Sequence, residues 1–134
     1  MAIKHDLMEN YTFQMSRHES LKMEIVELGK KWQILLDLSH FTIEHKFFSD
    51  FKDDNPETVA ETMTYWQYRD ARIDWYVPSA SRLGSIALEG VVVHELTHVL
   101  LSPMESNMKS NREELGELAT ENVARAFLNF KNNG

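Results

Sequence analysis

The chain of 134 residues has no cysteine, no long apolar run and no excess of basic charge. Without cysteine it can form neither a disulfide nor a thiolate metal site, so His, Asp and Glu would have to hold any bound metal. No stretch reaches the roughly 18 consecutive apolar residues of a membrane span, and no apolar signal core follows residues 1–6. We therefore expect a soluble, cytoplasmic protein with no membrane partner.

Acidic residues outnumber basic ones by 21 to 14, and the formal net charge is -7. A protein that binds nucleic acid or an anionic membrane would carry a basic patch, so neither partner is expected. The acidic balance is compatible with neutral or basic peptides. The length fits one domain with one core, which we expect to span 1–134, with 1–15 as a flexible arm or short irregular helix.

Hydrophobic periodicity divides the chain into helices and strands. Leu21, Ile25, Leu28 and Trp32 recur at helical spacing, whereas the middle of the chain alternates and is rich in aromatic and β-branched residues. The order predicts an α+β domain with an N-terminal helix, a small three-stranded antiparallel or mixed sheet and two further helices. The expected elements are a helix at 17–38, strands at 40–48, 59–68 and 71–77, a helix at 85–102 ended by Pro103, and a helix at 111–131.

His94, Glu95 and His98 form an HExxH sequence inside the apolar run of the helix expected at 85–102. Residues four apart share one face of a helix, so both imidazoles can point at one metal ion. Glu95 can then reach a metal-bound water and act as general base. The alternative is a pair of ordinary buried histidines, which would be costly without a partner. The motif therefore predicts a zinc site.

A catalytic zinc site of this kind needs a third protein ligand, and no histidine follows His98. Glu105 lies too close after Pro103 to fold back readily. Glu113 and Glu114 are better explained as first-turn carboxylates that face the helix dipole. The downstream candidates are Glu105, Glu113, Glu114, Glu117 and Glu121.

Glu117 and Glu121 lie one turn apart on a shared helix face. Either could bind the metal while the other supports a histidine ring from behind. Both could instead belong to a solvated face. However, Ala124 and Leu128 continue that face as a second apolar stripe, so it can pack on the motif helix. The sequence leaves Glu117 and Glu121 as the two ligand candidates.

These residues resemble the gluzincin branch of the zinc metallopeptidases. HExxH, eighteen residues and then Glu117 is similar to the aminopeptidase-type spacing, and residues 117–121 resemble the thermolysin-type pattern Glu-x-x-Ser-Asp. This resemblance implies that Glu117 binds zinc and that Glu121 supports His94. The overall layout is similar to small zincin-like proteins of phages and prophages, over most of residues 20–131, with specific motifs only at 94–127.

The resemblance implies a zinc-dependent peptidase that acts on a peptide or protein substrate. Gly116 stands where the thermolysin-type motif has Asn, and no downstream His or Tyr matches an oxyanion-stabilising residue. The alternative is a zincin-fold phage or prophage protein that binds metal in a structural or regulatory role, with little proteolysis.

Other residues have less specific interpretations. We expect His40 and His45, which flank the first strand, to occupy a strand end and a solvent-facing position rather than to bind metal. The strand at 71–77 should bury Ala71, Ile73, Trp75 and Val77 on one face, and the sequence leaves open whether it forms the wall of a substrate cleft. Tyr65, Trp66 and Tyr68 fit a half-buried sheet surface better than a pocket.

Overall fold

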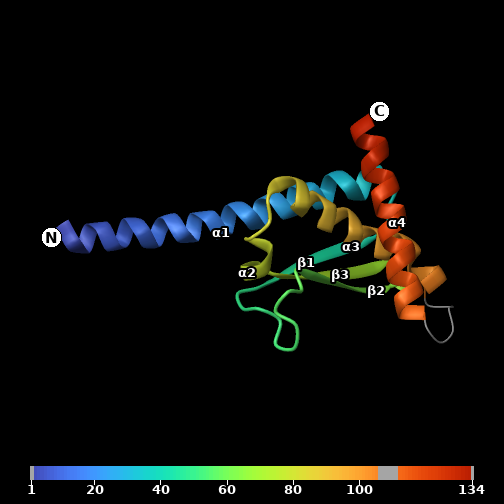
Figure 1. The fold of residues 1–134 in the computed structure, drawn as a ribbon, viewed down its shortest axis with the longest axis horizontal. Helices are drawn as coiled ribbons and strands as arrows, with labels where there is room; N and C mark the ends of the chain where they lie inside the picture. Colours follow the sequence, from blue (N-terminus) through green and yellow to red (C-terminus); the bar gives the residue numbers. More distant parts are fainter. Residues whose placement is uncertain (1, 106–111, 134) are drawn as a thin grey trace.

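The computed structural model describes residues 2–105 and 112–133 (Figure 1). In these two ranges the chain has an α+β architecture with four helices, one 3-10 turn and a three-stranded mixed sheet. The elements in chain order are α1 (Ala2–Leu35), β1 (Thr42–Phe48), β2 (Ala60–Tyr65), η1 (Trp66–Tyr68), β3 (Asp70–Tyr76), α2 (Val77–Ala80), α3 (Ser85–Glu105) and α4 (Arg112–Asn133).

The sheet has the order β1-β3-β2. β3 is the central strand, parallel to β1 and antiparallel to β2, with Ile73 opposite His45 on one side and Thr62 on the other. Both edges of β3 are therefore hydrogen-bonded, and β2 is an edge strand. The predicted small three-stranded sheet is confirmed, and of the two expected kinds, antiparallel or mixed, it is mixed. β1 and β2 are its edge strands, so a further chain could pair with either of them but not with β3.

The core lies between one face of the sheet and the helices α1 and α3. The buried face of β3 contributes Ile73 and Trp75, which are fully buried. Ile25 of α1 and Leu96 of α3 are also fully buried and belong to the same cluster. Each such side chain contributes about 1.5–3 kcal/mol through burial. The prediction for this strand face is confirmed, except that Val77 begins α2 instead of ending the strand.

The predicted boundaries of the first helix are wrong. α1 begins at Ala2 rather than near residue 17, and its first half extends away from the rest of the molecule (Figure 1). Residues 1–15 contain neither Gly nor Pro, so no residue type there interrupts helical hydrogen bonding. α1 ends at Leu35 because Asp37 adopts a left-handed conformation with φ 57°, and the Leu38 amide donates back to the Gln33 carbonyl at 2.8 Å.

The prediction that Pro103 ends the motif helix is also wrong, since α3 continues to Glu105. Pro103 has no amide to donate to the carbonyl four residues earlier, at Val99. The hydroxyl of Ser102 donates to that carbonyl at 2.7 Å, so this oxygen keeps a partner. Other boundaries also differ. The strand predicted at 59–68 covers Ala60–Tyr65 and is followed by η1. β1 begins at Thr42 rather than at residue 40, and α4 continues to Asn133 rather than ending at 131.

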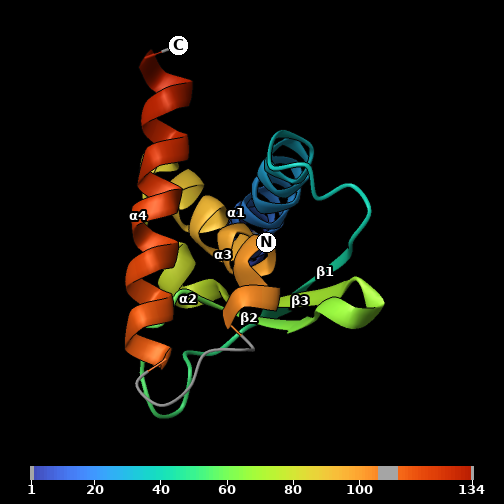
Figure 2. The ribbon, with the colours of Figure 1, turned by 90° about the vertical axis from the view of Figure 1, so that its right-hand side faces the viewer.

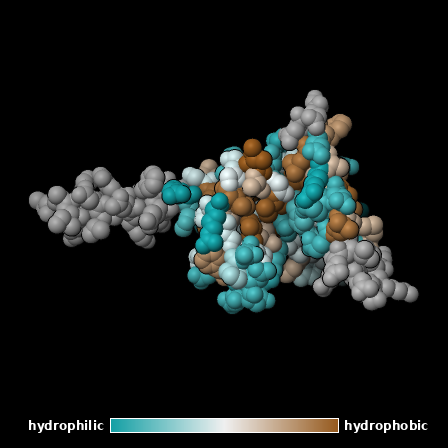
Figure 3. Space-filling model, viewed as in Figure 1, coloured by the Kyte–Doolittle hydropathy of each residue, from teal (hydrophilic) through white to brown (hydrophobic). Residues whose placement is uncertain are grey.

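α3 occupies the centre of the molecule, with the sheet below it and α4 along one side (Figure 2). By length and composition alone, α3 is the one helix of the described ranges that could cross a membrane. Its fully buried Val92, Val93 and Val99 instead belong to the core cluster. Hydrophobic surface remains in the middle of the face shown in Figure 3, above the hydrophilic loop between β1 and β2.

Candidate metal centre

The two histidines of the motif lie on the side of α3 that faces α4. Their rings are 4.9 Å apart between centroids and nearly perpendicular, with an interplanar angle of 79°. Helical periodicity brings them together, because residues four apart are neighbours on one face. Neighbouring Val92, Val93 and Leu96 pack into the core and fix the rotation of α3.

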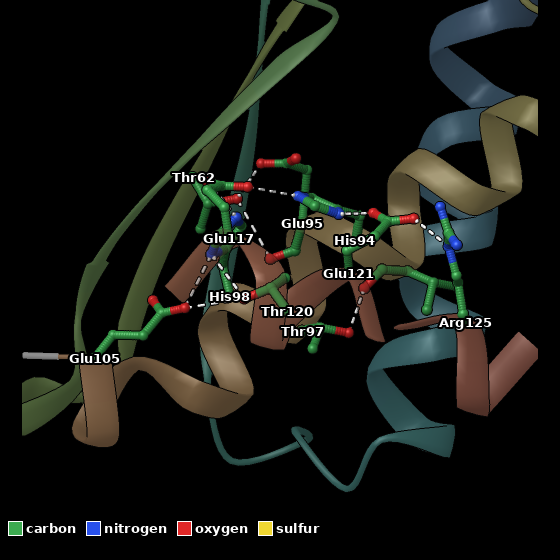
Figure 4. A network of polar contacts seen from close by, with 11 residues as sticks. Thr62, His94, Glu95, Thr97, His98, Glu105, Glu117, Thr120, Glu121 and Arg125 are labelled. Carbon is green, nitrogen blue, oxygen red and sulfur yellow. Dashed lines mark hydrogen bonds and ion pairs between the residues drawn. The ribbon is translucent and has the colours of Figure 1, made fainter. Parts of the chain in front are cut away.

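Both imidazoles present their Nε2 atoms to Glu117 of α4. One oxygen of this carboxylate lies 3.2 Å from Nε2 of His94, and the other lies 3.1 Å from Nε2 of His98 (Figure 4). The Glu117 side chain is 61% exposed, whereas the two histidine side chains are 21% and 16% exposed. The three groups therefore converge at a point that is open to solvent on the α4 side.

The opposite nitrogen of each ring also faces a carboxylate. Nδ1 of His94 lies 2.8 Å from Glu121, which is paired in turn with Arg125 at 2.9 Å. Nδ1 of His98 lies 3.3 Å from Glu105. The hydrogen bond from Arg125 is the main cause that lowers the pKa of Glu121, with a smaller contribution from His94, so Glu121 is an anion at neutral pH.

This arrangement is electrostatically incomplete without a cation. A neutral imidazole carries one N–H, so it can donate to a carboxylate through one nitrogen only. Here both nitrogens of His94 and both of His98 face carboxylate oxygens. Two further protons or one metal ion would satisfy the contacts, and a divalent ion between the Nε2 atoms and Glu117 would leave each Nδ1–H free to donate outward.

The donor set fits zinc. Ligand atoms about 2.1 Å from a tetrahedral zinc ion lie roughly 3.4 Å from one another. The separations between Glu117 and the Nε2 atoms of His94 and His98 are 3.2 and 3.1 Å, close to that value. Two imidazoles and one carboxylate are also a common ligand set of catalytic zinc, which leaves a fourth position for water.

Glu95 faces the sheet rather than α4. It is 7% exposed, and its carboxylate accepts a hydrogen bond of 2.8 Å from the Thr62 hydroxyl of β2. Burial raises the pKa of Glu95, while Thr62 and the two histidines oppose this shift. One oxygen of Glu95 lies within 4.8 Å of His94 and His98 ligand atoms, which makes it a second possible ligand. We favour Glu117 as the ligand because both of its oxygens contact an Nε2 atom, whereas Glu95 is held by Thr62.

A cavity of about 410 Å³ adjoins the site between β2, α3 and α4. His94, Glu95 and Glu121 of the site line it, and the Arg125 side chain, which is 71% exposed, lines it from α4. The rest of its wall is mostly apolar. The apolar lining residues are Val59, Ala60, Ala87, Val91, Ala124 and Leu128. An apolar side chain next to the site would therefore find a complementary cavity.

The sequence prediction for Glu105 is wrong in one respect. Glu105 does reach the histidines, because α3 continues through Pro103 and places this carboxylate beside Nδ1 of His98 rather than beside its Nε2. Its spacing of seven residues from His98, two helical turns, is the signal that could have placed it on the histidine face. A helix that ended at Pro103, as expected, would not have placed Glu105 on this face. Glu113 and Glu114 lie where the structure describes the backbone only.

Other residues considered from the sequence lie away from the centre. The expected solvent-facing position of His45 is wrong. Its ring is packed against α1, where a Cβ at Gly29 would come within 2.8 Å of it, and Nδ1 accepts a hydrogen bond from Trp75. His40 is exposed. The two exposed tyrosines, Tyr65 and Tyr68, lie at the far end of β2.

Comparison of the chain with known proteins gives no match to a family model and no significant similarity to a curated protein or a solved structure.

Proposed function

We propose that the protein is a zinc-dependent, gluzincin-like peptidase with a zincin-like fold. His94, His98 and Glu117 would hold the metal, and Glu121 would support His94. The observation that carries the proposal is the placement of carboxylates at both nitrogens of both imidazoles. Zinc is the cation that fits this donor set, as the separations of the ligand atoms support.

Each residue of the site would have a separate task in peptide hydrolysis. Zinc would supply a Lewis acid that lowers the pKa of a bound water. The Glu95 carboxylate would take the proton of that water and return it to the leaving amine, while the Thr62 hydroxyl holds the carboxylate in place. Glu121 and Arg125 would keep the His94 ring oriented.

The substrate would bind as an extended peptide along β2. This strand has one edge paired with β3, and its residues Ala60 and Thr62 lie beside the cavity and Glu95 respectively. An unpaired strand edge can bind a peptide through main-chain hydrogen bonds. The cavity would then take an apolar side chain beside the Arg125 guanidinium, which belongs to its lining.

The test measures metal content and peptide hydrolysis separately. Wild type should bind one zinc ion per chain and cleave members of a peptide library that have an apolar residue next to the cleaved bond. Glu95→Gln should keep the zinc and lose hydrolysis by on the order of 10³-fold or more. Glu27→Gln removes an exposed carboxylate of α1 and is the matched control. A wild type that binds no zinc after exposure to it would overturn the proposal.

A second function has one observation in its favour. Among the described residues that line the cavity, Arg125 is the one arginine or lysine, it is paired with Glu121, and there is neither a tyrosine nor a histidine other than His94. The site therefore offers few donors for an oxyanion. A zincin-fold protein that binds metal and a peptide without efficient cleavage, as a structural or regulatory module, is the alternative. Zinc binding with equal, negligible hydrolysis by wild type and Glu95→Gln would favour it.

A further inference from the structure

We propose that Glu105 and Thr120 form a positioning pair that orients His98, so that each zinc-binding imidazole has its own carboxylate behind it. This inference rests on the proposed zinc site. Glu105 lies outside the sequence motifs, and Thr120 stands at the Ser position of the Glu-x-x-Ser-Asp pattern, where no role was assigned to it. Glu105 comes from the last turn of α3, and Thr120 comes from α4.

The geometry joins the three side chains in one cluster. The Thr120 hydroxyl donates to one oxygen of Glu105 at 2.9 Å, and the same oxygen lies 3.3 Å from Nδ1 of His98 (Figure 4). Thr120 is fully buried, and its hydroxyl lies 3.4 Å from the same ring nitrogen. Because a threonine hydroxyl has one proton and gives it to Glu105, the Nδ1–H of His98 is left to donate to the carboxylate.

The backbone of α4 lies against this carboxylate. A Cβ at Gly116 would lie 3.4 Å from an oxygen of Glu105 and 3.6 Å from two of its carbons, which is ordinary van der Waals contact. Gly116 is buried and directly precedes Glu117, so the Glu105 side chain packs on α4 beside the residue whose carboxylate reaches the two Nε2 atoms.

The pair would act on His98 in two ways. Donation from Nδ1–H to a carboxylate selects the tautomer whose Nε2 lone pair is free for the metal, and it raises the basicity of that nitrogen. The hydrogen bond from Thr120 holds the carboxylate in place from the other helix. The equivalent support of His94 comes from Glu121, which is held by Arg125. Two unrelated pairs thus perform the same task on the two rings.

The test uses Glu105→Gln, which is nearly isosteric and can still accept from Thr120, together with Thr120→Val and the control Glu27→Gln. Zinc affinity is measured by competition with a chelator. The ligand field is measured from the visible spectrum of the cobalt(II)-substituted proteins. Glu105→Gln should weaken zinc binding by about 10–100-fold and change the cobalt spectrum, and Thr120→Val should do so less strongly. Glu27→Gln should match wild type.

Failure of the positioning role can be distinguished from failure of the proposed zinc site and from unfolding of a variant. If wild type binds neither zinc nor cobalt, the proposed function fails. If wild type binds both ions and folded Glu105→Gln binds them with the same affinity and spectrum, the positioning role is overturned. In the metal-free protein, the ring N–H signal of His98 should lie far downfield in wild type and move upfield in Glu105→Gln; an unchanged signal would also contradict the pair. Glu105→Asp should restore part of the affinity.

Discussion

Two carboxylates of α3, Glu89 and Glu95, lie fewer than two turns apart and have opposite surroundings. Glu89 accepts hydrogen bonds from Lys131 at 2.8 Å, from Trp32 at 2.9 Å and from Lys31 at 3.2 Å. Burial opposes its ionisation, but these three donors outweigh burial and lower its pKa to about 2. We call these four residues the Glu89 cluster. It joins α1, α3 and α4, and side chains of the protein itself balance the charge of its carboxylate.

The metal centre has the reverse composition. Four carboxylates, of Glu95, Glu105, Glu117 and Glu121, surround two imidazoles, and among the residues that the structure describes Arg125 is the one arginine or lysine in contact with these six side chains. The proposed metal ion would balance this excess of acceptors. The comparison teaches that two clusters on one helix can differ in charge balance: the chain itself neutralises Glu89, whereas the second cluster is left with an excess of carboxylates.

The largest expected effect is at the metal centre. Glu117→Ala removes the carboxylate that contacts both Nε2 atoms, and zinc affinity should fall by more than about 100-fold. Glu121→Ala removes support behind His94 only and should lower it by about 10–100-fold. Competition with a chelator measures both. A larger loss of zinc affinity in Glu121→Ala than in Glu117→Ala would show that Glu121 is the ligand.

Zinc itself should stabilise the protein. Binding to the folded state alone adds about 2.7 kcal/mol at a free zinc concentration 100 times the dissociation constant. Thermal unfolding with zinc and with a chelator measures the difference, which should disappear in a His94→Ala, His98→Ala double variant. An equal zinc effect in that variant would place the metal elsewhere.

A substitution in the Glu89 cluster should change the stability of the fold and leave zinc binding unchanged. Glu89→Gln should lower the free energy of unfolding by about 2 kcal/mol in denaturant titrations, because two lysines lose their anion, and should leave zinc affinity unchanged. The pKa of Glu89 is lowered in the fold, so its contribution is present above pH 4.5 and is lost as the pH falls toward about 2. A change in zinc affinity in this variant would contradict the separation of the two clusters.

The smallest effect concerns His45. Burial lowers the pKa of His45, so the unfolded chain takes up a proton near the ordinary value of 6.5 while the folded chain resists it. Its contribution to stability is complete above pH 6.5 and falls at lower pH. In chelator-treated protein, His45→Gln should lose less stability than wild type between about pH 6.5 and 5, whereas the exposed control His40→Gln should match wild type. Identical slopes for His45→Gln and wild type would contradict this role.

Several features of the fold followed from local patterns. The alternation in β3 predicted that Ala71, Ile73 and Trp75 share a buried face, and the structure confirms it. Helix ends were harder to predict. Pro103 marks a helix end by its chemistry, yet the Ser102 hydroxyl satisfies the carbonyl that Pro103 leaves unpaired. Such compensation depends on one side-chain rotamer, which periodicity does not report.

The sequence by itself determined the motif, the face shared by His94 and His98, and the choice of carboxylates downstream, because helical spacing is a local property of the chain. Tertiary structure alone decided which carboxylate lies at which nitrogen of the two histidine rings. The packing of α4 on α3 brings Glu117 to both Nε2 atoms and Glu121 to Nδ1 of His94. The order of the sheet makes β2, rather than β3, the edge strand beside Glu95. Both outcomes depend on contacts between residues far apart in the chain.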